Sequence, residues 1–87
     1  MQTTLCFDFG NTRLKCAIFE GDDLKDILIL ENGDAATVKD LVNRYKATAS
    51  ILASVIDHDP AIEVLLAAET IFHKLGHQSK LPFSTPV

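Results

Sequence analysis

Cysteines, clustered basic residues and long apolar runs are scarce in this chain, and each scarcity narrows the classes of protein it can belong to. Cys6 and Cys16 are the two cysteines, too few for the disulfide framework of a small secreted domain and typical of a reducing compartment. Eight basic residues stand against 12 acidic ones, the net charge is −4, and no two basic residues are adjacent. This balance argues against binding to a nucleic-acid backbone.

The sequence also lacks the long apolar segments that membranes require. No apolar stretch approaches the ~18 residues that cross a bilayer. The first residues carry no basic cluster and Asp8 interrupts their apolar run, unlike a signal peptide. We therefore expect a cytoplasmic protein. A hydrophobic fraction of 47% over 87 residues indicates one small globular domain, and no repeat or linker divides the sequence.

The most informative segment predicts an N-terminal β-hairpin. Residues Thr3–Phe9 and Thr12–Phe19 have strand character, and Gly10-Asn11 is typical of a two-residue turn. In that register Phe9 faces Thr12.

The same register sets the faces of the charged residues. Asp8 then faces Arg13, Cys6 faces Lys15, and the three charged side chains share one face because side chains alternate along strands. Cys6 and Cys16 fall on opposite faces, so no disulfide is expected between them.

The residues at the hairpin tip are of the types that bind a phosphate and its metal. Asp8 can hold a hydrated Mg²⁺, which prefers one or two carboxylates together with phosphate oxygens. The turn at Gly10 can present backbone N–H groups to an anion, and Lys15 adds a positive charge. A plain hairpin with a Gly-Asn turn and a cross-strand ion pair accounts for the same pattern, and spacing alone leaves both interpretations open.

A third strand and a first helix are predicted next. The apolar run Ile27–Leu30 lies in a predicted strand, Leu24–Glu31, that is antiparallel to the second strand and buried on both faces. Asp34 is a predicted N-cap of a helix that extends to about Lys46 and has one apolar stripe.

A further strand and helix follow. Residues Ser50–Ile56 are predicted as a short buried strand. Asp59-Pro60 begins a second helix, whose apolar positions repeat at i, i+3 and i+4 as far as Leu75. Gly76 stands where glycine commonly ends a helix, and His77–Leu81 is the predicted fifth strand.

The order β-β-β-α-β-α-β predicts an α/β fold with a mixed five-stranded sheet and both helices on one side. In the second strand Leu14, Cys16 and Ile18 share one face, and Ala17 and Phe19 share the other. One sheet face is therefore left without a helix. An exposed apolar face predicts that the isolated chain self-associates or is marginally stable.

This order of elements, with an acid, a glycine and a threonine in the first hairpin, resembles the opening half of the ribonuclease H-like, actin-like ATPase fold. Within that superfamily, Asp8-x-Gly10-Asn11-Thr12-x-x-Lys15 resembles the N-terminal motif of type III pantothenate kinases.

Two weaker stretches agree with this resemblance. Residues Ala53–Asp57 are similar to a Ser-Val-Val-Pro segment that ends the fourth strand in the family. Residues Lys80–Val87 resemble the family's fifth strand and the Thr-Pro segment after it. The resemblance covers the whole chain but only the first part of an enzyme with two tandem actin-like domains.

The resemblance implies ATP-dependent phosphorylation of pantothenate to 4′-phosphopantothenate in coenzyme A biosynthesis. It implies that Asp8 holds Mg²⁺, directly or through water. It also implies a monovalent cation (K⁺ or NH₄⁺) and a homodimer. The residues that it places in the binding site for ATP are Asp8, Gly10, Asn11, Thr12, Arg13, Leu14 and Lys15.

Parts of the family pattern do not occur in the chain. The family's catalytic Asp, in a Gly-x-Asp-Arg segment, is expected beyond Val87, so no catalytic residue is expected in residues 1–87. The second domain and the third helix of the first domain are also missing. We expect an incomplete N-terminal ATP-binding domain that is inactive alone. Phe9 replaces the family's usual small aliphatic residue.

Other functions remain open from the sequence. One is another actin-like small-molecule kinase, although sugar kinases usually carry Gly-Gly-Thr where this chain has Gly10-Asn11-Thr12. Others are a non-catalytic transcriptional regulator related to the kinase family, and an ordinary α/β fragment. Elsewhere, Ser54 is interpreted as a strand-end polar residue and His58 as a turn residue, and no Ser-His-acid spacing predicts a nucleophilic triad.

Overall fold

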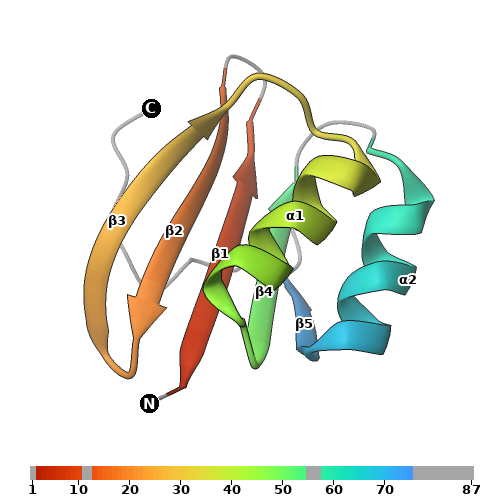
Figure 1. The fold of residues 1–87 in the computed structure, drawn as a ribbon. Coiled ribbons are helices and arrows are strands. Elements are labelled where there is room, and N and C mark those ends of the chain that lie inside the picture. Colours follow the sequence, from red (N-terminus) through yellow and green to blue (C-terminus); the bar gives the residue numbers. More distant parts are fainter. Residues whose placement is uncertain (1, 11–12, 55–57, 76–87) are drawn as a thin grey trace.

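The fold is a mixed five-stranded sheet with two helices packed on one side (Figure 1). A computed structural model describes residues 2–10, 13–54 and 58–75. The strands lie in the order β3-β2-β1-β4-β5, which leaves β1 in the centre. The predicted α/β class, order of elements and placement of both helices are thereby confirmed. The elements are β1 (Thr3–Phe9), β2 (Leu14–Glu20), β3 (Asp23–Leu30), α1 (Ala35–Tyr45), β4 (Ala49–Ser54), α2 (Pro60–Glu69) and β5 (Ile71–Leu75).

The N-terminal hairpin forms, but its predicted register is wrong by two residues. Asp8 lies opposite Lys15 rather than Arg13, and β2 begins two residues later than expected. The Gly10 N–H donates to the Arg13 carbonyl at 3.0 Å, so a four-residue connection replaces the predicted two-residue turn. Because the shift is an even number of residues, every strand side chain keeps its predicted face.

The two cysteines illustrate this conservation of faces. Cys6 and Cys16 are both buried and free, and they belong to clusters on opposite faces of the sheet, as predicted. Burial raises the pKa of Cys6 to about 11. Burial, together with the nearby Cys6, raises the pKa of Cys16 to about 12. Both are therefore neutral thiols at physiological pH and act as small apolar core residues.

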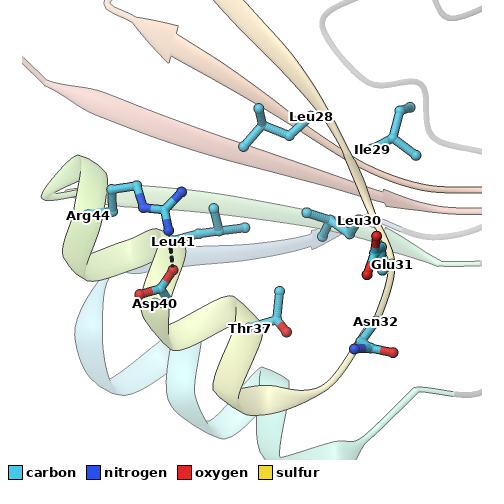
Figure 2. A pocket seen from close by; sticks show the side chains of 9 residues that line it. All are labelled: Leu28, Ile29, Leu30, Glu31, Asn32, Thr37, Asp40, Leu41 and Arg44. Atoms are coloured by element: carbon cyan, nitrogen blue, oxygen red, sulfur yellow. Dashed lines mark hydrogen bonds and ion pairs between the residues drawn. The ribbon is translucent and has the colours of Figure 1, made fainter.

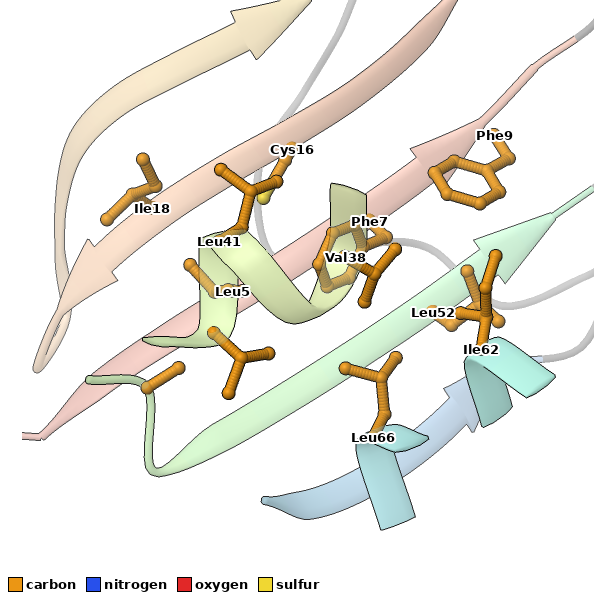
Figure 3. Packing of buried hydrophobic residues seen from close by; sticks show 12 residues of the cluster. Leu5, Phe7, Phe9, Cys16, Ile18, Val38, Leu41, Leu52, Ile62 and Leu66 are labelled. Carbon is orange, nitrogen blue, oxygen red and sulfur yellow. The ribbon is translucent and has the colours of Figure 1, made fainter. Parts of the chain in front are cut away.

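The main core lies between the sheet and the helices (Figure 3). The central strand β1 contributes Leu5, Phe7 and Phe9, and the rings of Phe7 and Phe9 meet edge to face with centroids 6.0 Å apart. The other strands and the helices supply the side chains that pack against this row: Cys16, Ile18, Val38, Leu41, Val42, Leu52, Ile62 and Leu66.

The opposite side of the sheet, called here the second face, carries a smaller cluster. Cys6, Ala17 and Phe19 are buried there, with Ile51 beside them. Neither described helix packs on this face, in agreement with the prediction of one face without a helix (Figure 1).

Strand β3 is an edge strand, so the prediction that it is buried on both faces is wrong. Ile27 and Ile29 point to the second face and are 41% and 55% exposed. Leu28 and Leu30 are partly buried against the main core. A continuous apolar run is buried on both faces only where other layers cover both faces.

Helix α1 begins and ends where the sequence predicts. The Asp34 carboxylate accepts a hydrogen bond from the Thr37 N–H at 2.8 Å, which caps the helix and lowers the pKa of that carboxyl. Lys46, in the left-handed conformation with φ 50°, closes the C-terminus. Neither described helix is long and apolar enough to cross a membrane.

Helix α2 begins at Pro60 after its cap Asp59, as predicted, but it ends at Glu69 instead of continuing to Leu75. Residues Ile71–Leu75 form β5, which pairs with β4 in parallel. The fifth strand therefore comes earlier than expected, and the predicted strand His77–Leu81 lies outside the described residues, as does Gly76. Strand β4 was predicted as Ser50–Ile56, and its last two predicted residues also lie outside.

Thr70 is the C-cap residue of α2 and links the helix end to the sheet. Its hydroxyl donates to the Leu66 carbonyl at 2.6 Å, and its backbone N–H binds the same carbonyl at 2.9 Å. Because that hydroxyl hydrogen is engaged, the buried Ser50 hydroxyl donates to Thr70 Oγ1, also at 2.6 Å. Thr70 thus caps α2 and fastens its end to β4, and the following Ile71 enters the sheet.

Candidate functional site

The hairpin loop and the end of β4 meet at one edge of the sheet. Strands β1 and β4 are parallel, with Asp8 opposite Ala53 and Phe9 opposite Ser54. In open α/β sheets, ligands bind outside the carboxyl ends of such strands. This edge therefore brings together the predicted phosphate-binding loop, the end of β4 and the start of α2.

Asp8 and Lys15 face each other on the second face of the sheet. They are partners across the β1–β2 ladder, and both are half-buried. The prediction that they share a face is therefore confirmed, and their pairing is closer than predicted. Arg13 is exposed and lies in the loop rather than opposite Asp8. The arrangement places one carboxylate and one ammonium beside the loop.

The loop offers fewer free groups than the sequence suggested. The Gly10 N–H is already bound to the Arg13 carbonyl, so it is not available to an anion. The Leu14 side chain packs against the main core, which leaves only its backbone for a ligand. Asn11 and Thr12 lie outside the described residues.

The contacts of Gly10 with the described residues do not require a glycine. Among the described residues, a Cβ built on Gly10 would meet the Arg13 carbonyl at an ordinary 3.5 Å, and its φ is not in the left-handed region. Gly33 differs, because a Cβ there would stand 2.9 Å from Leu14 Cδ1. A glycine at position 10 also leaves room for a ligand to approach the backbone closely.

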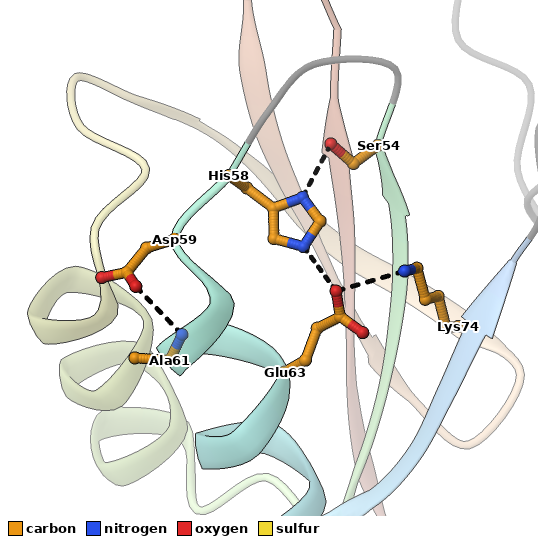
Figure 4. A network of polar contacts seen from close by, with 6 residues as sticks. All are labelled: Ser54, His58, Asp59, Ala61, Glu63 and Lys74. Carbon is orange, nitrogen blue, oxygen red and sulfur yellow. Dashed lines mark hydrogen bonds and ion pairs between the residues drawn. The ribbon is translucent and has the colours of Figure 1, made fainter.

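A chain of polar contacts stands on the helix side of the same edge (Figure 4). His58 Nδ1 lies 3.3 Å from Ser54 Oγ, and His58 Nε2 lies 2.7 Å from Glu63 Oε2. Lys74 Nζ donates to the same Glu63 oxygen at 3.2 Å. The His58 ring also meets the Phe9 ring edge to face, with centroids 6.5 Å apart.

Glu63 is the central charged group in this chain of polar contacts. The hydrogen bond with His58, and then the one with Lys74, lower the pKa of the Glu63 carboxyl. Glu63 is therefore ionised at neutral pH. The side chain of His58 is 13% exposed and that of Glu63 is 31% exposed, so the imidazole is largely shielded from water and the carboxylate is partly solvated.

Sequence reasoning missed this chain of polar contacts. Ser54 and His58 were interpreted separately as a strand-end residue and a turn residue, and no Ser-His-acid grouping was expected. One local signal existed, because His58 and Glu63 occupy the positions just before the N-cap and in the first turn of α2 that meet in a hydrophobic staple. The contact with Ser54 depends on β4 lying under α2, which spacing does not reveal.

The described residues form no all-protein site for the predicted metal. No three His, Cys, Asp or Glu side chains gather there in a way that could hold an ion. Mg²⁺ carried by a nucleotide needs only one or two carboxylates, since phosphate oxygens and water supply its other ligands. Asp8 thus fits a metal that arrives with a phosphate, and does not by itself make an all-protein site.

Two concavities lie away from this edge. One, of about 350 Å³, lies between the end of β3 and α1, with the Asp40–Arg44 ion pair at 2.8 Å on its helix wall (Figure 2). The other, of about 360 Å³, opens on the second face beside Cys6 and Phe19. Neither is lined by the residues of the hairpin tip.

No family model matches the chain, and no curated protein matches its sequence. A proposal for its function therefore depends on the residues, their arrangement and the motif resemblance.

Proposed function

We propose that this chain is the ATP-phosphate-binding part of a type III pantothenate kinase. The observation that carries the proposal is the pairing of Asp8 with Lys15 beside the Gly10 loop, at the carboxyl end of the central strand. A carboxylate for a metal, an ammonium for phosphate charge and a loop that tolerates close approach are the parts that phosphoryl transfer requires.

The topology supports the actin-like, ribonuclease H-like class. A meander of three strands is followed by two parallel strands that extend the sheet on the other side of β1, in the order β3-β2-β1-β4-β5. The resemblance of the Asp8-to-Lys15 motif narrows this class to the pantothenate kinases. The acceptor, pantothenate, is proposed on that motif alone.

Each residue has a distinct role in this proposal. Asp8 binds the Mg²⁺ of Mg-ATP, directly or through water, and the metal neutralises charge on the phosphates. Lys15 adds positive charge, and the connection of residues 10–13 with the Leu14 backbone contacts the phosphates. None of residues 1–87 is assigned as the base that takes the acceptor proton. A monovalent cation, a homodimer and a cytoplasmic location complete the proposal.

The test uses the complete protein with any sequence beyond Val87. ADP release from Mg-ATP is measured with pantothenate, in the presence and absence of K⁺, for the unsubstituted protein and for Asp8→Asn. We expect pantothenate-dependent turnover that falls about a hundredfold or more in Asp8→Asn, because the amide cannot neutralise the metal.

Asp23→Asn is the matched control, since Asp23 is an exposed carboxylate at the start of β3 and pairs with Glu20 at the far end of the hairpin. It should leave turnover unchanged. ATP binding without turnover on pantothenate would point to another acceptor or to a regulatory protein. Nucleotide affinity that is unchanged in Asp8→Ala would contradict the assigned role of the hairpin.

A further inference from the structure

Phe9 is the last residue of β1, and it joins Asp8, the proposed metal ligand, to Gly10. Its backbone is the last rung of two ladders. Leu14 of β2 is its partner on one side, and Ser54 of β4 is its partner on the other. Because both ladders end at this residue, the course of the chain around it depends on how its side chain is held.

The buried Phe9 ring is in contact with the entry points of both helices. Gly33 directly precedes Asp34, the N-cap of α1. A Cβ built on Gly33 would stand 3.7 and 3.9 Å from two ring carbons of Phe9, so the β3–α1 connection lies beside the ring. His58 directly precedes Asp59, the N-cap of α2. The His58 ring meets the Phe9 ring edge to face, with centroids 6.5 Å apart.

Both of these neighbours are themselves fixed in place. His58 Nε2 lies 2.7 Å from Glu63 Oε2, and Lys74 Nζ of β5 donates to the same oxygen at 3.2 Å. The imidazole is thereby tied to α2 and to the edge of the sheet. At the β3–α1 connection, a Cβ at Gly33 would stand 2.9 Å from Leu14 Cδ1, so a side chain there would displace Leu14. Glycine therefore allows this connection to approach the start of β2.

We propose that Phe9 is a positioning residue for the hairpin edge, whose ring, held at the starts of both helices, fixes how the Asp8 carboxylate and the Gly10 backbone are presented to a metal-bound phosphate. The side chains of Phe9 and Asp8 point to opposite faces of the sheet, so Phe9 acts through the backbone that they share and touches no ligand. The ligand class rests on the proposed function. The anchoring of Phe9 rests only on its contacts with the described residues.

Phe7 provides a matched comparison within the same strand. It is fully buried on the same face of β1, and its ring centroid lies 6.0 Å from that of Phe9 (Figure 3). It lies inside the sheet, however, and both ladders continue beyond it in each direction. Its backbone is therefore held by hydrogen bonds whether or not the ring is present, whereas Phe9 stands where the ladders end.

The test measures binding of ADP to the full chain by calorimetry, once with Mg²⁺ and once with EDTA in its place. The ratio of the two affinities reports the metal contact, because partial unfolding would lower both affinities by the same factor. We expect Phe9→Leu to reduce this ratio about tenfold, the effect of one contact to a charged group. Phe7→Leu should lower the free energy of unfolding to a similar extent and leave the ratio unchanged.

Gly33→Ala tests the same anchor from outside the strand. The added methyl group displaces Leu14, so it should lower the ratio in the same direction. It should also move the backbone amide NMR signals of Gly10 and Lys15 in the unliganded chain. Gly21→Ala is the matched control, because Gly21 lies in the turn at the far end of β2. It should lower stability and leave the ratio and these two signals unchanged.

The outcomes separate this role from the proposed function. A ratio that is the same in Phe9→Leu, Gly33→Ala and the unsubstituted chain would overturn the role of Phe9 and leave the proposed function standing. An equal fall in Phe7→Leu would also overturn it, because general core packing would then account for the effect. If Phe9→Leu does not fold, Gly33→Ala decides. No gain in ADP affinity from Mg²⁺ in the unsubstituted chain would overturn both proposals.

Discussion

Gly21 and Gly10 differ in whether their backbone conformation disfavours a side chain, and this difference provides a test at the scale of single residues. Gly21 has φ 60° and so adopts a conformation that a side chain disfavours, whereas Gly10 meets only ordinary contacts if a Cβ is added. Gly21→Ala should therefore lower the free energy of unfolding by about 1–2 kcal/mol and leave anion binding unchanged. Gly10→Ala should leave stability nearly unchanged.

Gly10→Ala should nevertheless weaken Mg-ADP binding by about tenfold, because the methyl group holds the phosphate away from the loop backbone and costs at least one hydrogen bond to a charged group. Denaturant unfolding and calorimetry measure the two effects separately. Equal loss of stability in both variants, with no change in affinity for Mg-ADP, would show that Gly10 serves the turn rather than a ligand.

Glu63 gives a prediction for the pH dependence of stability. Its folded-state pKa is lowered from the ordinary 4.5, first by His58 and then by Lys74. A lowered pKa contributes stability above the unfolded-state pKa, and this contribution is lost as the pH falls through the folded-state value. Glu63→Gln should thus reduce the Tm at neutral pH, and the difference from the unsubstituted chain should shrink as the pH falls below about 4.5.

Thermal unfolding followed by circular dichroism across this pH range measures the effect. Glu69→Gln is the control on the same helix, since Glu69 is an exposed carboxylate at its end. A difference in Tm for Glu63→Gln that stays constant down to the lowest pH would mean that packing, and not charge, accounts for it.

At the scale of elements, Thr70 is the C-cap of α2 and directly precedes β5. Thr70→Ala removes a hydroxyl that donates to Leu66 and accepts from the buried Ser50. Leaving Ser50 without its partner should cost about 1–3 kcal/mol of unfolding free energy, measured by denaturant titration. Thr70→Ser keeps the hydroxyl and should lose much less.

A double substitution isolates the contact between these two hydroxyls. Ser50→Ala combined with Thr70→Ala should cost less than the sum of the two single changes. Strict additivity would mean that the 2.6 Å contact between the hydroxyls does not contribute to stability.

The same helix shows how far sequence patterns predict elements. Helix α1 was predicted closely because its cap, Asp34, and its apolar stripe are both local. The stripe of α2 seemed to continue because Ile71, Phe72 and Leu75 fit a helical period. In the structure they belong to β5, which pairs with β4 in parallel, and the preceding Thr70 binds Ser50; both partners are distant in sequence. The hairpin loop escaped prediction for a related reason, since a Gly-Asn pair suits several loop lengths.

At the scale of the whole molecule, the second face is the feature with the largest consequence for solution behaviour. Ile29 of β3 and Ile71 of β5 lie on it, 55% and 75% exposed. We expect the isolated chain to self-associate through this face. Ile29→Lys combined with Ile71→Lys should shift the chain toward monomer in sedimentation velocity, with little loss of stability because both side chains are already exposed.

Val64→Lys is the matched control, because Val64 is 70% exposed but lies on α2, away from the second face. It should not change the sedimentation profile. A monodisperse, cooperatively unfolding monomer of the unsubstituted chain at high concentration would contradict the expectation.

The candidate site was predictable only in part, and the reason is again distance along the chain. Asp8 and Lys15 could be assigned to one face because strand alternation survives an even shift in register. The chain of contacts from Ser54 through His58 to Glu63 could not, because it requires β4, the start of α2 and β1 to meet at one edge.

The place of β1 at the centre of the sheet has a consequence for how the protein is made. On the ribosome β1 emerges first and β2 soon covers one of its edges, but its other edge pairs with β4. That edge stays bare until Ser54 has been translated, after β2, β3 and α1. A bare edge of an apolar strand is a template for pairing with other chains. Among the strands that end up paired on both edges, β1 is thus the one whose second edge stays bare longest, and a chaperone that shields it would have its main effect before α2 is made.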